Sequence, residues 1–162
     1  MSVPANVSKV LFLVAATFAA TSALGAQAAA SAKAVLELHP GAAAGESVVV
    51  LRITSAGRPL ASYQGLITFS TEKVEIVSAD VPTDAYRVVN KDDAPTGKLR
   101  FAGFATDGFH ADTALKIRVR SRASGAALTV KLDVAGDVVG KPFPPASLGS
   151  ATIRIPNRPA KP

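Results

Sequence analysis

Apolar and polar side chains alternate with a period of two along most of this chain, which is the pattern of strands that bury one face. In residues 128–134, for example, Leu128, Val130, Leu132 and Val134 fall on the same side. No segment after the first 28 residues has the 3.6-residue period of an amphipathic helix. The pattern predicts eight or nine short strands, at residues 34–38, 47–54, 60–70, 74–79, 87–90, 98–105, 113–120, 128–134 and 151–155.

Glycine, proline, serine and aspartate mark the turns between these segments, at intervals of about 8–12 residues. The clearest turn is residues 91–97, Lys-Asp-Asp-Ala-Pro-Thr-Gly. Gly65 lies inside a predicted strand, which indicates a β-bulge or the close approach of another backbone. Short strands separated by turns predict an all-β fold in two antiparallel layers, a β-sandwich. The pattern leaves open whether its topology is immunoglobulin-like or jelly-roll.

The first 28 residues have the organisation of a cleavable secretory signal peptide. A basic start with Lys9 precedes an uncharged apolar run that is strongest at residues 10–14, and Ala26-Gln-Ala28 is a small-x-small cleavage site. The strongly apolar part is shorter than the ~20 residues of a membrane span, which favours cleavage over anchoring. No cysteine follows the site and no arginine pair precedes the run. We therefore expect export by the general secretory route, into the periplasm or the extracellular space.

Cleavage after Ala28 would leave 134 of the 162 residues, about the size of one domain. We assign the sandwich to residues 34–155 and a Pro-rich tail to residues 156–162. The chain has no cysteine, so the domain depends on packing and backbone pairing rather than on disulfides. After Ala28, 17 basic and 12 acidic residues give a net charge of +5 without dense clustering, which argues against nucleic-acid binding. No second long apolar run occurs, so we expect no membrane insertion after cleavage.

Three segments occur in an order that is similar to cohesin domains. Residues 63–81, Tyr-Gln-Gly-Leu-Ile-Thr-Phe-Ser-Thr-Glu-Lys-Val-Glu-Ile-Val-Ser-Ala-Asp-Val, resemble two consecutive cohesin strands and the turn that joins them. Residues 97–105, Gly-Lys-Leu-Arg-Phe-Ala-Gly-Phe-Ala, resemble the next central strand. Residues 113–120, Thr-Ala-Leu-Lys-Ile-Arg-Val-Arg, resemble the strand that opens the following hairpin. Ser70-Thr71 stands where the family has Asp-Pro.

This resemblance extends over residues 34–155 and implies a nine-stranded jelly-roll sandwich, a fold that cohesins share with some cellulose-binding modules. In cohesins, one sheet face binds the helix pair of a dockerin. The resemblance assigns no dockerin contact to any residue of this chain. A cohesin-like domain that recognises another partner is equally compatible with it.

Catalysis and metal binding have few candidate residues, because the chain has two histidines and no cysteine. His110 lies between Asp107 and Asp112, but an acid–base or metal site needs these side chains to converge with a further partner. We interpret this segment as a polar loop and His39 as the end of a strand. No Gly-x-Ser-x-Gly nucleophile motif occurs, and no stretch has the acidic spacing of a calcium loop. We therefore expect no enzyme activity, no metal site and no cofactor.

The most distinctive surface feature is a row of basic residues, which we call the basic row. Lys116, Arg118 and Arg120 share the outward side of one strand, each about 6.6 Å from the next, and Arg122 follows them. Lys131 on the next strand is predicted to join the row across the pairing. Such a row would bind an acidic protein or a polyanionic glycan, or would be a solvated face that discourages aggregation. A sugar-stacking platform is disfavoured, because the chain has no tryptophan and two tyrosines.

Together these observations predict an exported, non-catalytic binding module that attaches to a protein or a polysaccharide outside the cytoplasm. The alternative is a structural subunit of a cell envelope or secreted matrix, which would pair its strands with those of its neighbours.

Overall fold

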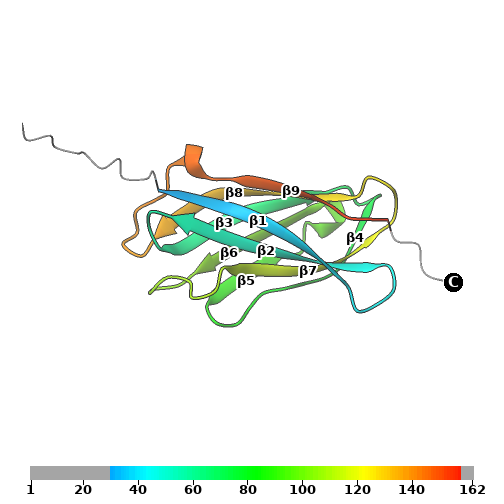
Figure 1. Cartoon of the computed structure of the whole chain (residues 1–162), viewed down its shortest axis with the longest axis horizontal. Helices are drawn as coiled ribbons and strands as arrows, with labels where there is room; N and C mark the ends of the chain where they lie inside the picture. The colour runs from blue at the N-terminus through cyan, green and yellow to red at the C-terminus, as the bar shows by residue number, and fades with distance from the viewer. Residues whose placement is uncertain (1–29, 158–162) are drawn as a thin grey trace, which may run out of the picture.

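The computed structural model describes residues 30–157, which form two antiparallel sheets packed face to face (Figure 1). Two 3₁₀ turns, η1 (Ala94–Thr96) and η2 (Pro145–Ser147), connect β5 to β6 and β8 to β9. The predicted all-β sandwich is confirmed. In chain order the strands are β1 (Ser31–Pro40), β2 (Glu46–Ala56), β3 (Leu60–Phe69), β4 (Val74–Asp80), β5 (Tyr86–Asn90), β6 (Lys98–Phe104), β7 (Thr113–Ser121), β8 (Ala127–Asp137) and β9 (Ser150–Arg154).

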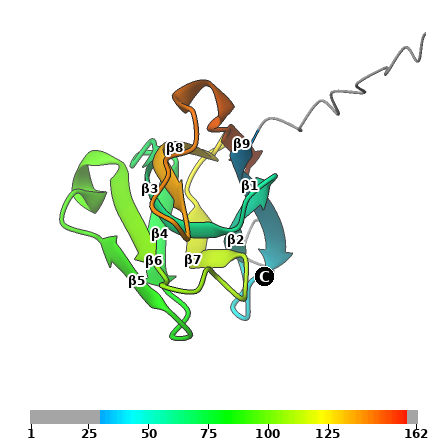
Figure 2. The ribbon, with the colours of Figure 1, turned by 90° about the vertical axis from the view of Figure 1, so that its left-hand side faces the viewer.

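The order of the strands resolves the topology. Sheet A contains four strands in the order β1-β2-β7-β4, and sheet B contains five in the order β5-β6-β3-β8-β9. The chain crosses from one sheet to the other after β2, β3, β4, β6 and β7, so most neighbours in a sheet are distant in sequence. The neighbours β2-β7-β4 in one sheet and β6-β3-β8 in the other give the jelly-roll order of strands rather than the immunoglobulin one. Viewed from one end, the strands form two layers that face each other (Figure 2).

The core consists of the side chains that point between the sheets. Leu51, Leu115 and Ile117 of sheet A and Ile67 and Leu99 of sheet B are fully buried. The apolar residues at every second position of these strands therefore face inward, as the sequence predicted. Their burial excludes water from aliphatic surface, which supplies the main stabilisation of a domain without disulfides.

Two strand boundaries differ from the prediction by three residues, and the others by two or fewer. β1 begins at Ser31 rather than at residue 34, because Ser31 to Lys33 pair with the end of β2, Ser31 lying opposite Ala56. β8 continues to Asp137 rather than ending at residue 134. A bulge lies between, since Gln64 is opposite Val134 while Gly65 is opposite Leu132. The hydrophobic alternation predicts where a strand ends. At the start of β1 the small residues Ser31 and Ala32 interrupt it, and near the end of β8 the bulge does.

Two strand glycines permit close contacts within sheet B. Gly65 lies at the bulge, and a Cβ placed there would be 2.5 Å from the Phe101 ring and 2.6 Å from the carbonyl oxygen of Lys131. A Cβ on Gly103 would be 2.4 Å from Cζ of Tyr63. Both expectations for Gly65, a bulge and a close backbone approach, are confirmed.

A buried ion pair fixes the loop that follows β8. The guanidinium of Arg58 donates to Asp137 at 2.7 Å and to the carbonyl of Pro142 at 3.0 Å. Asp137 also accepts from the backbone N–H groups of Val139 (3.1 Å) and Lys141 (2.8 Å). Burial alone would raise the pKa of Asp137, but these N–H groups and Arg58 outweigh it and hold that pKa below its ordinary value.

The predicted signal peptide with its cleavage residues Ala26 and Ala28, and residues 158–162 of the predicted tail, lie outside the described residues. Among residues 30–157, no helix has the length and apolar character needed to cross a membrane.

Candidate functional site

The basic row lies on the outer face of sheet A. β7 occupies an inner position between β2 and β4, and Lys116, Arg118 and Arg120 all point outward and are exposed. Arg122 follows the end of the strand and is also exposed. The structure therefore places these four residues together, as the sequence predicted.

Neighbouring strands compensate much of the charge of the basic row. Arg120 donates to Glu46 on β2 at 2.9 Å and to Glu75 on β4 at 3.3 Å. Arg122 lies 3.5 Å from the same Glu75, and Nε of Arg118 donates to Ser78 at 2.8 Å. An anion that approached this face would have to compete with carboxylates already in place, so the row is less available than its sequence indicates.

Lys131 does not belong to this face, and the prediction that it joins the row is wrong. It lies on β8, which pairs with β3 and β9 in sheet B and not with β7. Its side chain therefore points outward on the opposite side of the sandwich, 4.0 Å from Asp133. The error arose because consecutive strands of a jelly-roll need not be neighbours in one sheet.

An apolar patch lies on the outer face of sheet B, and sequence reasoning missed it. Four of its side chains are strongly exposed: Tyr86 (69%), Val88 (42%), Phe104 (52%) and Val134 (53%). Across the sheet, Tyr86 is opposite Phe104, and Val88 is opposite Ala102. We define the apolar patch as these residues with the half-buried Leu66, namely Tyr86, Val88, Ala102, Phe104, Val134 and Leu66.

Val134 reaches this face only because of the bulge in β8. The alternation predicted it inside with Leu128, Val130 and Leu132, but the additional residue Asp133 reverses the alternation. Val134 consequently points outward beside Gln64 of β3. Gly65 was the sequence signal for this bulge, because a glycine inside a strand often marks a place where the regular pairing with the next strand is interrupted.

Charged residues border the apolar patch at one end. Lys98 and Arg100 of β6 and Lys131 of β8 point from the same face and are exposed. Arg100 lies 3.7 Å from Asp93. An apolar centre with a polar border is the composition of many protein–protein interfaces.

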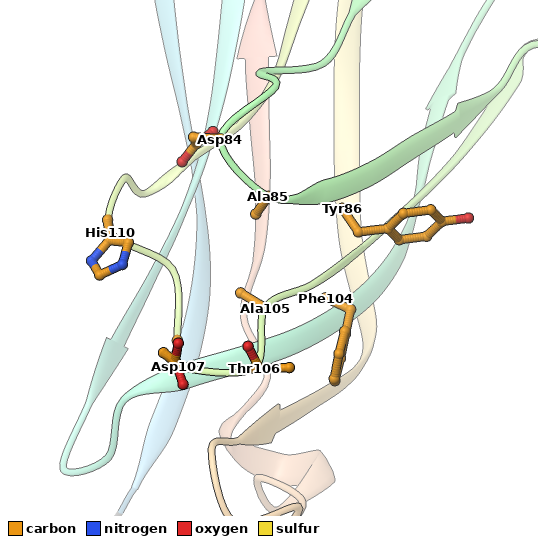
Figure 3. Close-up of a pocket in the computed structure, with 9 residues that line it drawn as sticks. Asp84, Ala85, Tyr86, Phe104, Ala105, Thr106, Asp107 and His110 are labelled. Atoms are coloured by element: carbon orange, nitrogen blue, oxygen red, sulfur yellow. The ribbon is translucent and has the colours of Figure 1, made fainter.

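A hollow of about 310 Å³ adjoins the aromatic end of the patch. Figure 3 shows Asp84, Asp107 and His110 on one side of the hollow and Tyr86 and Phe104 on the other. It is open to solvent and shaped by the loop that follows β6.

Asp107, His110 and Asp112, which the sequence led us to interpret as parts of a polar loop, do not converge in this hollow. Asp112 is bound instead by Arg52 of β2 at 2.6 Å. Within residues 30–157, no three His, Asp or Glu side chains come together as a metal site would require. His39 lies exposed at the end of β1, 3.6 Å from Glu37.

A buried cluster holds β5 and thereby the aromatic end of the patch. Arg87 of β5 turns inward, where its side chain is 1% exposed and binds the carboxylate of Asp84 and the carbonyl of Ala111 (3.2 Å). The guanidinium lies 4.8 Å from the Phe109 ring centre, and Phe109 packs on Tyr63 at 4.9 Å. The hydrogen bond from Arg87 lowers the pKa of Asp84, while burial raises the pKa of Tyr63.

Comparison with known proteins identifies the fold. No family model and no curated protein sequence matches the chain. A cohesin module from a family 33 glycoside hydrolase of Clostridium perfringens superposes with a TM-score of 0.58 and 13% identity, over 77% of this chain and 95% of that one. A non-cellulosomal cohesin from the archaeon Archaeoglobus fulgidus gives 0.56 and 12%, over 80% and 92%. The sixth cohesin of scaffoldin B from Acetivibrio cellulolyticus, solved with the Cel5 dockerin, gives 0.53 and 15%, over 75% and 96%. The expected cohesin-like fold is confirmed, and at this identity the likeness concerns the fold alone.

Proposed function

From its cohesin-like fold, we propose that this chain is an exported, non-catalytic module that binds a protein partner on the outer face of sheet B. The observation that carries the proposal is the apolar patch. Exposed aromatic and aliphatic side chains that adjoin one another, as Tyr86, Val88, Ala102 and Phe104 do, favour a docking surface. The exposed Gln64 separates them from Val134. Tyrosine, as at Tyr86, is among the residue types that most often dominate binding energy, and the rings of Tyr86 and Phe104 both offer a large rigid surface for burial.

The partner class that the fold suggests is a dockerin. Several of the superposed cohesins were solved in complexes with dockerins. At 8–15% identity, no contact of theirs transfers to a residue of this chain. The proposal for the binding face therefore rests on the patch itself, and the dockerin is its first candidate partner.

Calorimetric titration with purified dockerin modules tests this proposal. Val134→Lys places a charge at the β8 side of the patch, next to Gln64, without removing a core side chain, since Val134 is 53% exposed. Val35→Lys is the matched control, because Val35 is also an exposed strand valine but lies on sheet A. The proposal predicts binding that Val134→Lys weakens about tenfold or more and Val35→Lys leaves intact. Equal effects of the two variants would remove the apolar patch as the interface.

A polysaccharide is the second candidate ligand, and the exposed pair Tyr86 and Phe104 favours it. Cross-strand neighbours with exposed rings offer apolar surface on which a sugar ring can stack. Titration with soluble polysaccharides, comparing the protein with Tyr86→Ala, separates this ligand from a protein. Polysaccharide binding that Tyr86→Ala leaves unchanged would argue against stacking.

Export is supported by the N-terminal signal. If residues 1–28 are removed on secretion, the protein recovered outside the cytoplasm has Ala29 as its first residue. Intact-mass measurement of that protein checks the cleavage site, and a mass that includes residues 1–28 would contradict it.

A further inference from the structure

A turn after β6 forms one wall of the hollow of about 310 Å³. The N–H of Gly108 donates to the carbonyl of Ala105 at 3.4 Å, and Gly108 has the positive φ, 86°, that a glycine adopts without strain. Strand β3 holds both ends of the turn, because its backbone carbonyls accept from the N–H groups of Ala105 (2.9 Å) and Phe109 (3.0 Å). The wall is therefore fixed to the sandwich on both sides.

This turn presents two exposed polar side chains to the hollow, the hydroxyl of Thr106 and the carboxylate of Asp107. His110 and Asp84 line the same side (Figure 3). Arg87 binds the carboxylate of Asp84, but within residues 30–157 no hydrogen bond or ion pair engages the side chain of Asp107. The hollow therefore offers one carboxylate whose oxygens are free to accept from a ligand.

The other side of the hollow is apolar. Tyr86 and Phe104 are opposite each other on β5 and β6, and they are 69% and 52% exposed. The remaining lining residues are small and leave the space open: Ala85, Ala105 and Gly108. Aromatic surface beside a few fixed polar groups is the composition of a small-ligand site.

We propose that this hollow binds one neutral hexose unit of a polysaccharide. A pyranose ring has C–H groups that pack on aromatic surface, and its hydroxyls both donate and accept hydrogen bonds. Two adjacent hydroxyls donate to the two carboxylate oxygens of Asp107, and the other hydroxyls exchange hydrogen bonds with Thr106 and His110. This inference rests on a polysaccharide as the second candidate ligand of the protein, and it adds the class of sugar and the residues that hold it.

The charges around the hollow favour a neutral sugar over a charged ligand. Asp107 would repel the carboxylate of a uronic acid or the sulfate of a sulfated sugar. A basic side chain of a protein would also donate to Asp107, but the net charge of +5 after Ala28 (17 basic minus 12 acidic residues) and the guanidinium of Arg87 bound to Asp84 both oppose a cation. Hydroxyls gain the same hydrogen bonds without this repulsion.

Affinity electrophoresis in native gels that contain a glucan, a mannan or a galactan tests the proposal. At least one of these polysaccharides should slow the protein, and Asp107→Ala should raise the dissociation constant about tenfold or more, because it removes hydrogen bonds to a charged group. Asp133→Ala is the matched control, since it removes the same charge from sheet B at a residue that does not line the hollow. Migration that none of the three polysaccharides slows, or equal effects of the two variants, overturns the proposal.

An NMR titration with free hexoses gives a second measurement that needs no variant. Glucose, mannose or galactose should shift the amide signals of residues 106–110 more than those of the basic row, which lies on the other sheet. The amide of N-acetyl-arginine, as a model of a basic side chain, should shift them less. If only the arginine derivative shifts them, a basic side chain of a protein fills the hollow and the sugar proposal is wrong.

Val134→Lys separates this inference from the proposed protein interface. Val134 does not line the hollow, so the substitution should weaken a protein partner on the apolar patch and leave sugar binding unchanged. If no dockerin binds but Asp107→Ala still weakens sugar binding, the protein interface is refuted and the sugar site stands. Sugar binding that Val134→Lys abolishes and Asp107→Ala leaves intact would place the sugar on the apolar patch, and the hollow is then not the site.

Discussion

Replacing Gly103 by alanine should destabilise the domain, although the backbone there would otherwise tolerate it. Gly103 has no positive φ, and a glycine in an ordinary strand conformation usually gains about 0.4–1 kcal/mol of stability on replacement by alanine. The added Cβ, however, would lie 2.4–2.8 Å from three atoms of Tyr63, its Cζ, Oη and Cε1. Contacts this short require the ring to move.

The Tyr63 ring has little room to move, because it packs against Phe101 at 6.1 Å and Phe109 at 4.9 Å between ring centres. Overpacking of this kind costs about 1–3 kcal/mol, so we expect Gly103→Ala to lower the free energy of unfolding by that amount. The sign of the effect is therefore opposite to that of an unobstructed Gly→Ala replacement.

Urea unfolding followed by circular dichroism measures the effect, and a double-mutant cycle assigns it. Tyr63→Val removes the atoms that the new Cβ would meet, so Gly103→Ala should cost much less in that background. If the two effects are instead additive to within about 0.5 kcal/mol, the ring is not the obstacle and the reasoning fails. Gly65→Ala is the comparison: its Cβ would also meet the backbone carbonyl of Lys131 at 2.6 Å, so truncating Phe101 should not rescue it.

Three further predictions concern titratable groups and the basic row. Because the pKa of Asp137 is lower in the fold than the unfolded value of about 3.9, ionised Asp137 stabilises the fold above that pH. This stabilisation is lost as the pH falls through the folded pKa, so Asp137→Asn should make Tm decline less steeply in acid. Because burial raises the pKa of Tyr63, its neutral form is favoured in the fold; stability should fall above about pH 10, and Tyr63→Phe should reduce that fall in an alkaline Tm series. Lys116→Glu with Arg118→Glu should abolish retention on a heparin column if the basic row binds polyanions; unaltered retention would falsify that role.

The sequence predicted features that depend on the alternation within one strand. It did not predict features that depend on which strands are neighbours in a sheet. The alternation correctly placed Leu115 and Ile117 inside, because a strand at an inner position of a sheet directs every second residue to the core. It misplaced Val134, since one bulge residue reverses the alternation beyond it. It misplaced Lys131 because strand pairing, which the alternation does not report, puts β8 in the other sheet from β7.

The apolar patch could not be found for the same reason. Its members come from β3, β5, β6 and β8, and none is unusual alone, because single exposed apolar residues are common on protein surfaces. Only the pairing of Tyr86 with Phe104 and of Val88 with Ala102 shows that they adjoin. The basic row, by contrast, lies on one strand and was visible as a repeat.

The crossing of the chain between the sheets has a consequence for how the domain forms. β7 must enter between β2 and β4, and β8 must enter beside β3, so neither sheet is complete until the last third of the chain is present. Bringing distant segments together costs loop-closure entropy before their contacts stabilise the chain. Such topologies therefore fold slowly, in about milliseconds to seconds. Until β7 pairs with it, β2 has one unpaired edge along its apolar run Val48 to Leu51. The nascent protein is therefore most vulnerable to aggregation through β2, a strand that the finished structure fully protects.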